Sequence, residues 1–226
     1  MTERIDAVIF DMDGSLVDSM WIWKQIDIDY LSFYGYDVSD ESIAAFQAKI
    51  EGMSFDETAE WVSEHYEIPR TKQEMMDDWN RMAWEKYEKE VFLKPGAKEF
   101  LDYCRNKGIK LGIASSNSRE LIENVLSARK LEGVFDIIKT GSDGLPGKPA
   151  PDVYLAAAEE LDVKPEHCLV FEDIPKGIRS GKGAGMIVCA VEDVYSMHQI
   201  EEKKRLADFY IEDYYDLFKQ GIFTCQ

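Results

Sequence analysis

Five short apolar runs constrain the fold more than any other feature of this sequence. They read RIDAVIF (4–10), IKLGIAS (109–115), FDIIKT (135–140), CLVFED (168–173) and MIVCAV (186–191). Several of them are apolar on both faces, which is typical of strands that are buried on both sides. The runs therefore predict a mainly parallel sheet with helices packed against each face.

Amphipathic stretches lie between these runs. PGAKEFLDYCRNKG (95–108) places apolar side chains on one helical face, begins near Pro95 and stops at Gly108, as helices tend to. PDVYLAAAEEL (151–161) and PKGIRSGKGAG (175–185) read as further helices, and ADFYIEDYYDLF (207–218) as a last strand and helix. The alternation predicts a doubly wound, Rossmann-like α/β fold.

Residues 17–90 interrupt the alternation with helical patterns and no predicted strand. We predict a core domain of residues 1–17 and 91–226, and an inserted helical domain of residues 18–90. The insertion would cover the edge of the sheet where the strands end, which is where ligands bind in such folds. We expect hinges near Asp18–Ser19 and Glu90–Phe92, and expect Asp18 to cap the first inserted helix.

Polar side chains gather at the ends of the predicted strands and in one loop rich in glycine and proline. Because the carboxyl ends of parallel strands meet at one edge of a sheet, we expect these residues to converge. They are Asp11, Asp13 and Gly14 after the first run, Ser115, Ser116 and Asn117 after the second, Lys148 in GLPGKPAPD, and Glu172 and Asp173.

The two aspartates at the end of the first strand indicate the chemistry. Buried carboxylates are costly to ionise unless a cation compensates them. Mg²⁺ prefers oxygen ligands, so Asp11, Asp173 and a carbonyl near Asp13 are candidate ligands. Lys148 would supply a second cation and Ser115 a hydroxyl donor to a phosphate. With charge arranged in this way, a carboxylate can attack phosphorus, and Asp13 can serve as acid and base.

The acidic composition limits the partners. The chain of 226 residues has 26 basic and 44 acidic side chains, and a net charge of −18, which repels nucleic acids and anionic membrane surfaces. No apolar stretch approaches the roughly 18 residues that span a bilayer, and the start resembles no secretory signal. The four cysteines (Cys104, Cys168, Cys189 and Cys225) form no CxxC pair, which fits a reducing interior. We predict a cytoplasmic monomer whose partner is a small phosphate ester.

Four ordered motifs resemble those of the haloacid dehalogenase (HAD) superfamily, in its phosphatase and β-phosphoglucomutase-like branch. They are DMDGSLVDS, GIASSNS, GKPAPD and FEDIPKGIRSGKGAGM, and they span Asp11 to Met186. The inserted helices occupy the place of the family's C1-type cap. The resemblance implies a Mg²⁺-dependent phosphomonoesterase that hydrolyses a small phosphorylated metabolite through an aspartyl-phosphate intermediate.

The resemblance also implies a role for each matching residue. Asp11 would be the nucleophile and Asp13 the general acid and base. Ser115 and Lys148 would bind the transferring phosphoryl group, with Gly14, Ser116 and Asn117 as further substrate contacts. Asp173 would be the principal downstream Mg²⁺ ligand, and Glu172 would bind the metal directly or through water.

Alternative activities follow from the same motifs. A dehalogenase would lack the second aspartate, so Asp13 argues against one. A sugar phosphomutase needs a cation for its second phosphate. KIEGMSFDETAEW (49–61) resembles the specificity loop of such enzymes, with Lys49 and Gly52 as candidate substrate-binding residues. Phe55 stands where they tend to carry an arginine, which favours hydrolysis because an apolar ring cannot clamp phosphate.

Two further alternative functions stay open, as does the choice between two tryptophans as pocket residues. Lys49 would permit a Schiff base, as in a phosphonoacetaldehyde-type hydrolase. A non-enzymatic phospho-receiver would share the aspartate, serine and lysine without the inserted helices. Trp21 or Trp23 would line the substrate pocket.

Overall fold

A six-stranded parallel sheet organises the structure, a computed structural model that describes residues 4–223. Every strand pairs in parallel with its neighbours. This confirms the predicted fold class. In spatial order the strands are β5 (Ile137–Thr140), β4 (Lys110–Ser115), β1 (Ala7–Phe10), β6 (Cys168–Glu172), β7 (Ile187–Val191) and β8 (Phe209–Ile211).

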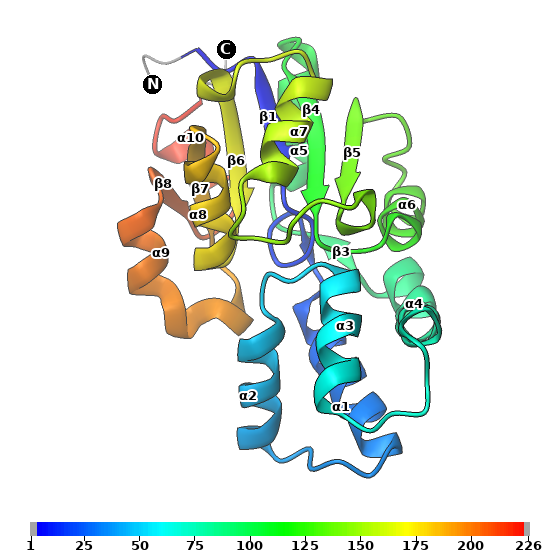
Figure 1. Cartoon of the computed structure of the whole chain (residues 1–226). Coiled ribbons are helices and arrows are strands. Elements are labelled where there is room, and N and C mark those ends of the chain that lie inside the picture. Colours follow the sequence, from blue (N-terminus) through cyan, green and yellow to red (C-terminus); the bar gives the residue numbers. More distant parts are fainter. Residues whose placement is uncertain (1–3, 224–226) are drawn as a thin grey trace.

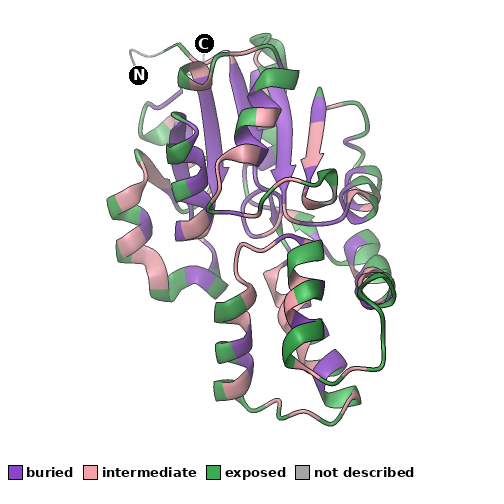
Figure 2. Ribbon diagram, viewed as in Figure 1, coloured by how far each residue is buried: buried purple, intermediate pink, exposed green. Residues whose placement is uncertain are grey.

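Helices cover both faces of this sheet. Side chains alternate across a strand, so Val8 and Phe10 of β1 join an apolar cluster with α5, whereas Ala7 and Ile9 join one with α7. Figure 1 shows α7 and α8 in front of the sheet, and Figure 2 shows that the strands between the layers are largely buried. The helices that follow the first ninety residues are α5 (Ala97–Asn106), α6 (Arg119–Ala128), α7 (Asp152–Glu160), α8 (Pro175–Gly183), α9 (Ile200–Leu206) and α10 (Asp216–Lys219).

Four helices, which we call the helical block, lie beyond the carboxyl ends of the strands (Figure 1). Two of them begin at capping boxes, formed by Ser54 with Glu57 and by Thr71 with Glu74. Each box satisfies backbone N–H groups that the first turn of a helix leaves unpaired. The helical block consists of α1 (Met20–Phe33), α2 (Asp40–Ile50), α3 (Phe55–His65) and α4 (Lys72–Lys89).

The two connections to the helical block pair with each other. Strands β2 (Val17–Asp18) and β3 (Phe92–Leu93) form a short antiparallel ribbon. The prediction of no strand in residues 17–90 was wrong here, because two residues carry no readable pattern. The prediction that Asp18 caps α1 was also wrong, since Asp18 is an exposed strand residue and Ser19 occupies the N-cap position.

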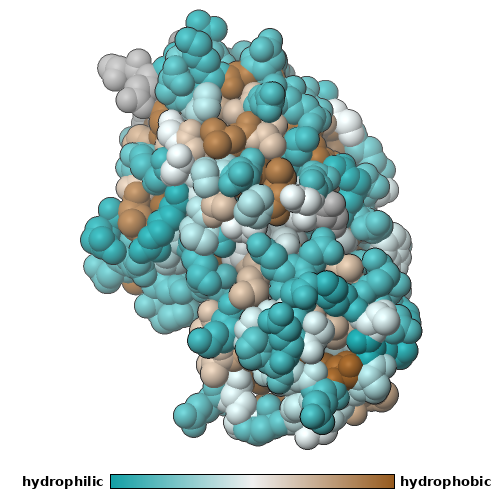
Figure 3. Space-filling model, in the orientation of Figure 1, coloured by the Kyte–Doolittle hydropathy of each residue, from teal (hydrophilic) through white to brown (hydrophobic). Residues whose placement is uncertain are grey.

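Short 3₁₀ segments complete the chain. They are η1 (Gly141–Asp143), η2 (Pro165–His167) and η3 (Val194–Gln199). Cys104, Cys168 and Cys189 are buried free thiols, whereas Cys225 lies outside the described residues. The face seen in Figure 3 is mainly hydrophilic over both the sheet layers and the helical block. Within residues 4–223, no helix is both long and apolar enough to cross a membrane.

Candidate active site

A cavity of about 770 Å³ opens where the helical block meets the end of the sheet. Strand β1 lies between β4 and β6, and later parts of the chain extend the sheet on both of its sides. Such a switch point leaves a crevice at the carboxyl ends of the strands. Loops of the sheet and helices of the block both line the cavity, so groups from either part can contact one ligand.

Three carboxylates lie together at the floor of this cavity. Asp11, Glu172 and Asp173 are buried, and one oxygen of each lies within 4.8 Å of the others. Burial raises the pKa of Asp11 against the opposing effect of Lys148, and burial with the charge of Asp11 raises that of Asp173. Buried anions so close together require positive charge, and an all-oxygen donor set fits a hard cation such as Mg²⁺. The side chain of Asp13 is not part of this cluster.

The turn after β1 is shaped around Asp173. Gly14 has a φ of +80°, and a Cβ at this position would lie 2.3 Å from Asp173 Oδ2, so only glycine fits. Ser15 Oγ donates a hydrogen bond of 3.2 Å to Asp173 Oδ1. Gly14 was predicted to bind substrate, but it is not among the residues that line the cavity. Its effect is to make room for the carboxylate.

Lys148 reaches the same carboxylates from the loop before α7. Its Nζ lies 2.5 Å from Asp11 Oδ1 and 2.6 Å from Glu172 Oε1. Tyr154 OH donates a 2.5 Å hydrogen bond to the same Glu172 oxygen. Burial alone would lower the pKa of Lys148, but the charges of Asp11 and Glu172 raise it. Lys148 is therefore a fixed cation beside Asp11.

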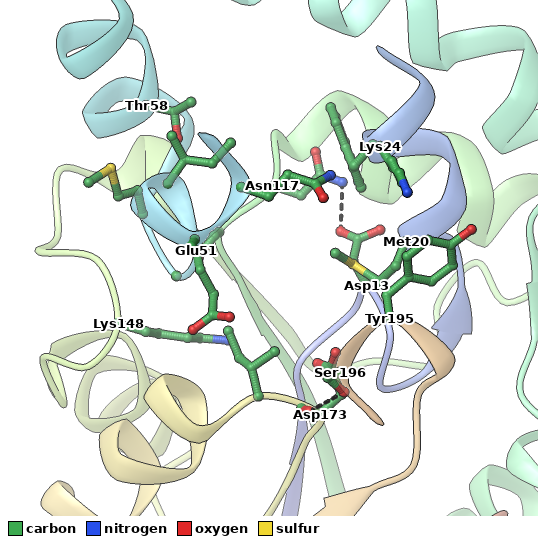
Figure 4. Close-up of a pocket in the computed structure, with 18 of the residues that line it drawn as sticks. Asp13, Met20, Lys24, Glu51, Thr58, Asn117, Lys148, Asp173, Tyr195 and Ser196 are labelled. Atoms are coloured by element: carbon green, nitrogen blue, oxygen red, sulfur yellow. Dashed lines mark hydrogen bonds between the residues drawn. The ribbon is translucent and has the colours of Figure 1, made fainter. Parts of the chain in front are cut away.

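Asp13 is held by donors from three parts of the chain. Ser19 Oγ donates to Asp13 Oδ1 at 2.5 Å, and Asn117 Nδ2 donates to Oδ2 at 2.8 Å (Figure 4). Tyr87 OH, on α4, also donates to Asp13 Oδ1 and accepts a 2.7 Å hydrogen bond from Trp23 Nε1. The carboxylate thus lies at the cavity edge in a defined position, between the sheet and the helical block.

The loop after β4 adds small polar groups. Ser115, Ser116 and Asn117 all line the cavity, as the sequence predicted. Ser115 Oγ is buried and accepts a 3.1 Å hydrogen bond from the backbone N–H of Asn117. Within residues 4–223 this is the hydrogen bond of the Ser115 side chain, so its hydroxyl proton can point toward a ligand. The Asn117 amide, expected to contact substrate, is instead engaged with Asp13.

The helical block contributes Trp23 to the cavity, and the turn between α2 and α3 contributes Gly52. Gly52 has a φ of +79°, and a Cβ there would lie 2.9 Å from the carbonyl oxygen of Lys148. Of the alternatives Trp21 or Trp23, it is Trp23 that lines the cavity, whereas the predicted contact of Lys49 is not found. Lys49 is exposed, because each residue turns about 100° around a helix and Gln47 takes the inward position. Trp21 does not line the cavity, and its ring lies under the Lys86 ammonium instead.

Other residues of the cavity wall were not predicted from the sequence. Lys24, Asp27, Gln47 and Thr58 are the polar ones among those from the helical block, and η3 contributes Tyr195, Ser196, His198 and Gln199. Figure 4 shows Lys24 on the side of the cavity where Asp13 and Asn117 lie. The inward direction of those from the helical block depends on how four helices pack against one another, and the spacing along each helix carries no sign of it.

Sequence comparison decides the family. A family model described as haloacid dehalogenase-like hydrolase matches residues 8–191, which is most of the chain. The chain belongs to the haloacid dehalogenase-like hydrolase family. The predicted superfamily is therefore confirmed.

Curated relatives match nearly the whole chain. A probable pseudouridine-5'-phosphatase of Drosophila melanogaster is 30% identical over 233 residues, covering 93% of this chain and 94% of that protein. A phosphorylated carbohydrates phosphatase of Thermotoga maritima is 31% identical over 211 residues, covering 90% and 91%. Among solved structures, CbbY of Rhodobacter sphaeroides in complex with phosphate has a TM-score of 0.83 at 24% identity, covering 95% of this chain and 97% of that one. That likeness establishes the shared fold.

Proposed function

We propose that this HAD-family enzyme is a Mg²⁺-dependent phosphomonoesterase that works through a phosphoryl group on Asp11. The observation that carries the proposal is the position of Lys148, 2.5 Å from Asp11 and 2.6 Å from Glu172, beside a third carboxylate at the floor of the cavity. The sequence prediction of a phosphatase agrees with the family match and with relatives named as phosphatases.

The first half of the reaction transfers the phosphoryl group to the enzyme. A carboxylate oxygen of Asp11 attacks phosphorus, and the bond from phosphorus to the ester oxygen breaks. Asp13 gives its proton to the leaving alkoxide. Lys148 and the Ser115 hydroxyl stabilise the phosphoryl oxygens as charge moves onto them. The products of this half are a free alcohol and an acyl phosphate at Asp11.

The second half returns the enzyme to its starting state. Asp13, now ionised, accepts a proton from water, and the water oxygen attacks phosphorus. The bond between phosphorus and Asp11 breaks, and inorganic phosphate leaves. Asp11, Glu172 and Asp173 are the residues that would hold Mg²⁺, whose charge would offset that of the carboxylates and of the phosphoryl group.

We propose further that residues 18–90 form a cap that closes the cavity over the substrate. Contacts between residues 18–90 and the rest of the chain support this. Lys176 Nζ donates to the Glu51 carbonyl at 2.6 Å, and the Gly147 N–H donates to Glu57 Oε1 at 3.0 Å. A closed cavity keeps bulk water away from an acyl phosphate. A cytoplasmic location, a monomeric state and the absence of nucleic-acid or membrane partners stay predictions.

A sugar phosphomutase is the second candidate, and Lys24 is the observation that favours it. This lysine lines the cavity, and it makes no hydrogen bond or ion pair with another residue of the part of the chain that the structure describes. It offers a charge for a second phosphate. Against this, Phe55 packs its ring near those of Trp23 and Trp79. The exposed position of Lys49 supports neither a phosphate clamp nor a Schiff base.

A phosphate-release assay tests the proposal. The purified chain is incubated with sugar, polyol, nucleotide and aryl phosphates, with Mg²⁺ or with a chelator, and sugar phosphates are also assayed for isomerisation. We expect phosphate release that depends on Mg²⁺. Isomerisation without net release of phosphate would indicate the mutase. Stable labelling by acetyl phosphate with no ester turned over would indicate a receiver.

A further inference from the structure

A polar pair interrupts the apolar wall of the helical block. Asp27 of α1 and Gln47 of α2 both line the cavity, and Gln47 Nε2 donates a hydrogen bond of 3.1 Å to Asp27 Oδ2. Asp27 Oδ1 accepts no hydrogen bond from any residue between positions 4 and 223. An ionised carboxylate can accept about four hydrogen bonds, so this cavity-lining side chain has unused capacity to accept them.

Keeping a carboxylate at this position costs folding free energy. Burial raises the pKa of Asp27 to about 7, against the smaller lowering effect of the Gln47 amide. A second apolar residue would join α1 to α2 without that cost. Residues that are unfavourable for stability and face a cavity are candidates for ligand recognition.

Three aromatic rings of the helical block line the same cavity as the pair. The Trp23 and Phe55 rings lie 5.5 Å apart and the Phe55 and Trp79 rings 5.7 Å apart, each pair edge to face, and all three line the cavity. Aromatic rings pack against the C–H faces of a carbon chain or sugar ring, while a carboxylate and an amide take its hydroxyl groups. An anionic group bound beside Asp27 would be repelled.

Lys24 does not remove this repulsion. It lies one helical turn before Asp27, on the side of the cavity where Asp13 and Asn117 lie (Figure 4). Lys24 forms no ion pair with Asp27 within residues 4–223, and its charge does not contribute to the shift in the Asp27 pKa. The wall around Asp27 fits a leaving group that is uncharged and rich in hydroxyl donors.

We propose that Asp27 and Gln47 are specificity-determining residues that accept and donate hydrogen bonds to hydroxyl groups of the leaving group. The preferred substrate is then the phosphate monoester of a neutral polyhydroxyl compound, a sugar or a polyol. This inference rests on the proposed phosphatase function and names the substrate class of the same site.

Steady-state kinetics on two kinds of ester tests the inference. Glycerol phosphate and ribose phosphate carry hydroxyls on the leaving group, and phenyl phosphate carries none. We expect Asp27→Asn and Gln47→Leu to lower kcat/KM for the better hydroxylated ester about 10- to 100-fold, chiefly through KM. The same variants should change kcat/KM for phenyl phosphate by no more than about twofold.

Asp29→Asn is the matched control. It makes the same substitution two residues further along α1, at an exposed position. It should leave kcat/KM for both esters unchanged. Asp27→Asn nearly preserves the shape of the side chain, so it keeps the test informative if Gln47→Leu fails to fold.

The possible outcomes separate the two proposals. Equal losses on hydroxylated and phenyl esters, no loss on either, or a wild-type preference for phenyl phosphate or for nucleotides would overturn the inference and leave the phosphatase function intact. Failure of the wild type to release phosphate from every ester, with and without Mg²⁺, would overturn the proposed function and the inference with it.

Discussion

Tyr87 and Asp13 are 74 positions apart in the chain, yet the Tyr87 hydroxyl on α4 donates a hydrogen bond to Asp13 Oδ1 beside β1. The same hydroxyl accepts from Trp23 Nε1 at 2.7 Å and from Asn117 Nδ2 at 3.0 Å. The helical block therefore fixes the position of the proposed acid and base directly.

Tyr87→Phe should lower kcat for an alkyl phosphate about tenfold, because one hydrogen bond to Asp13 is lost and two donors lose their acceptor. The loss should be smaller for nitrophenyl phosphate, whose leaving group needs no proton. Tyr34→Phe is the control, since that hydroxyl accepts from Arg70 outside the cavity. Equal losses on the two esters would argue that Tyr87 acts only on folding.

The buried carboxylates make stability depend on Mg²⁺. We expect Mg²⁺ to raise the unfolding temperature of the wild type, since a cation that binds the folded state stabilises it, and a chelator to abolish activity. Asp173→Asn should remove the response to Mg²⁺. Without metal the variant should be at least as stable as the wild type, because a buried charge is gone. Thermal unfolding of both proteins, with Asp102→Asn on α5 as control, checks this. An unchanged Mg²⁺ response in Asp173→Asn would contradict the metal assignment.

Two glutamates, Glu57 and Glu74, each complete a capping box, but they differ in their other contacts. Glu57 caps α3 and also accepts from the Gly147 N–H, next to Lys148. Glu74 caps α4 and lies 3.9 Å from the guanidinium of Arg70, four residues before it. Glu57→Ala and Glu74→Ala should each lower the free energy of unfolding by about 1 kcal/mol. Glu57→Ala alone should also raise KM about three- to tenfold. Urea unfolding and kinetics on the same preparations test this, and a similar KM in both variants would count against a closing contact at Gly147.

The raised pKa of Asp27 should make the free energy of unfolding depend on pH. Burial raises this pKa from 3.8 to about 7. Between those pH values the folded protein holds a proton that the unfolded chain has released, so stability falls as pH rises and levels off above about pH 7. The free energy of unfolding of Asp27→Asn should therefore be about 1–3 kcal/mol larger than that of the wild type at about pH 8. The difference should shrink toward about pH 4. Urea unfolding across this range measures it, and curves that stay parallel would show that Asp27 is not buried as an acid.

Residues at strand ends were predictable from the sequence, whereas most polar residues that the helices contribute to the cavity were not. Asp11, Lys148 and Asp173 follow apolar strands or a Gly/Pro-rich loop, and a parallel sheet brings all such ends to one edge whatever the details of packing. Asp27 and Tyr87 lie on amphipathic helices whose inward faces depend on the angles at which four helices cross. Periodicity fixes one face of a helix but not what that face meets.

Lys49 shows that locating a helix near the cavity does not predict which of its side chains face the cavity. The loop around Gly52 does reach the cavity, where Gly52 lies against the backbone of Lys148. Within the preceding helix, a difference of two residues turns a side chain by about 200°, enough to exchange Gln47 for Lys49 at the cavity. The ribbon of β2 and β3 was missed for a different reason, since its pairing is set by two distant segments.

The central claim is that Asp11 carries the phosphoryl group, and acid-quenched peptide mass analysis tests it most directly. The Asp13→Asn variant should accumulate the intermediate from nitrophenyl phosphate, because its leaving group departs unaided while attack by water lacks a base. We predict one phosphoryl group on the peptide that contains Asp11, and a loss of turnover of at least about 1,000-fold in a folded Asp11→Asn variant. A phosphoryl group on another residue, or normal turnover by folded Asp11→Asn, would contradict the account.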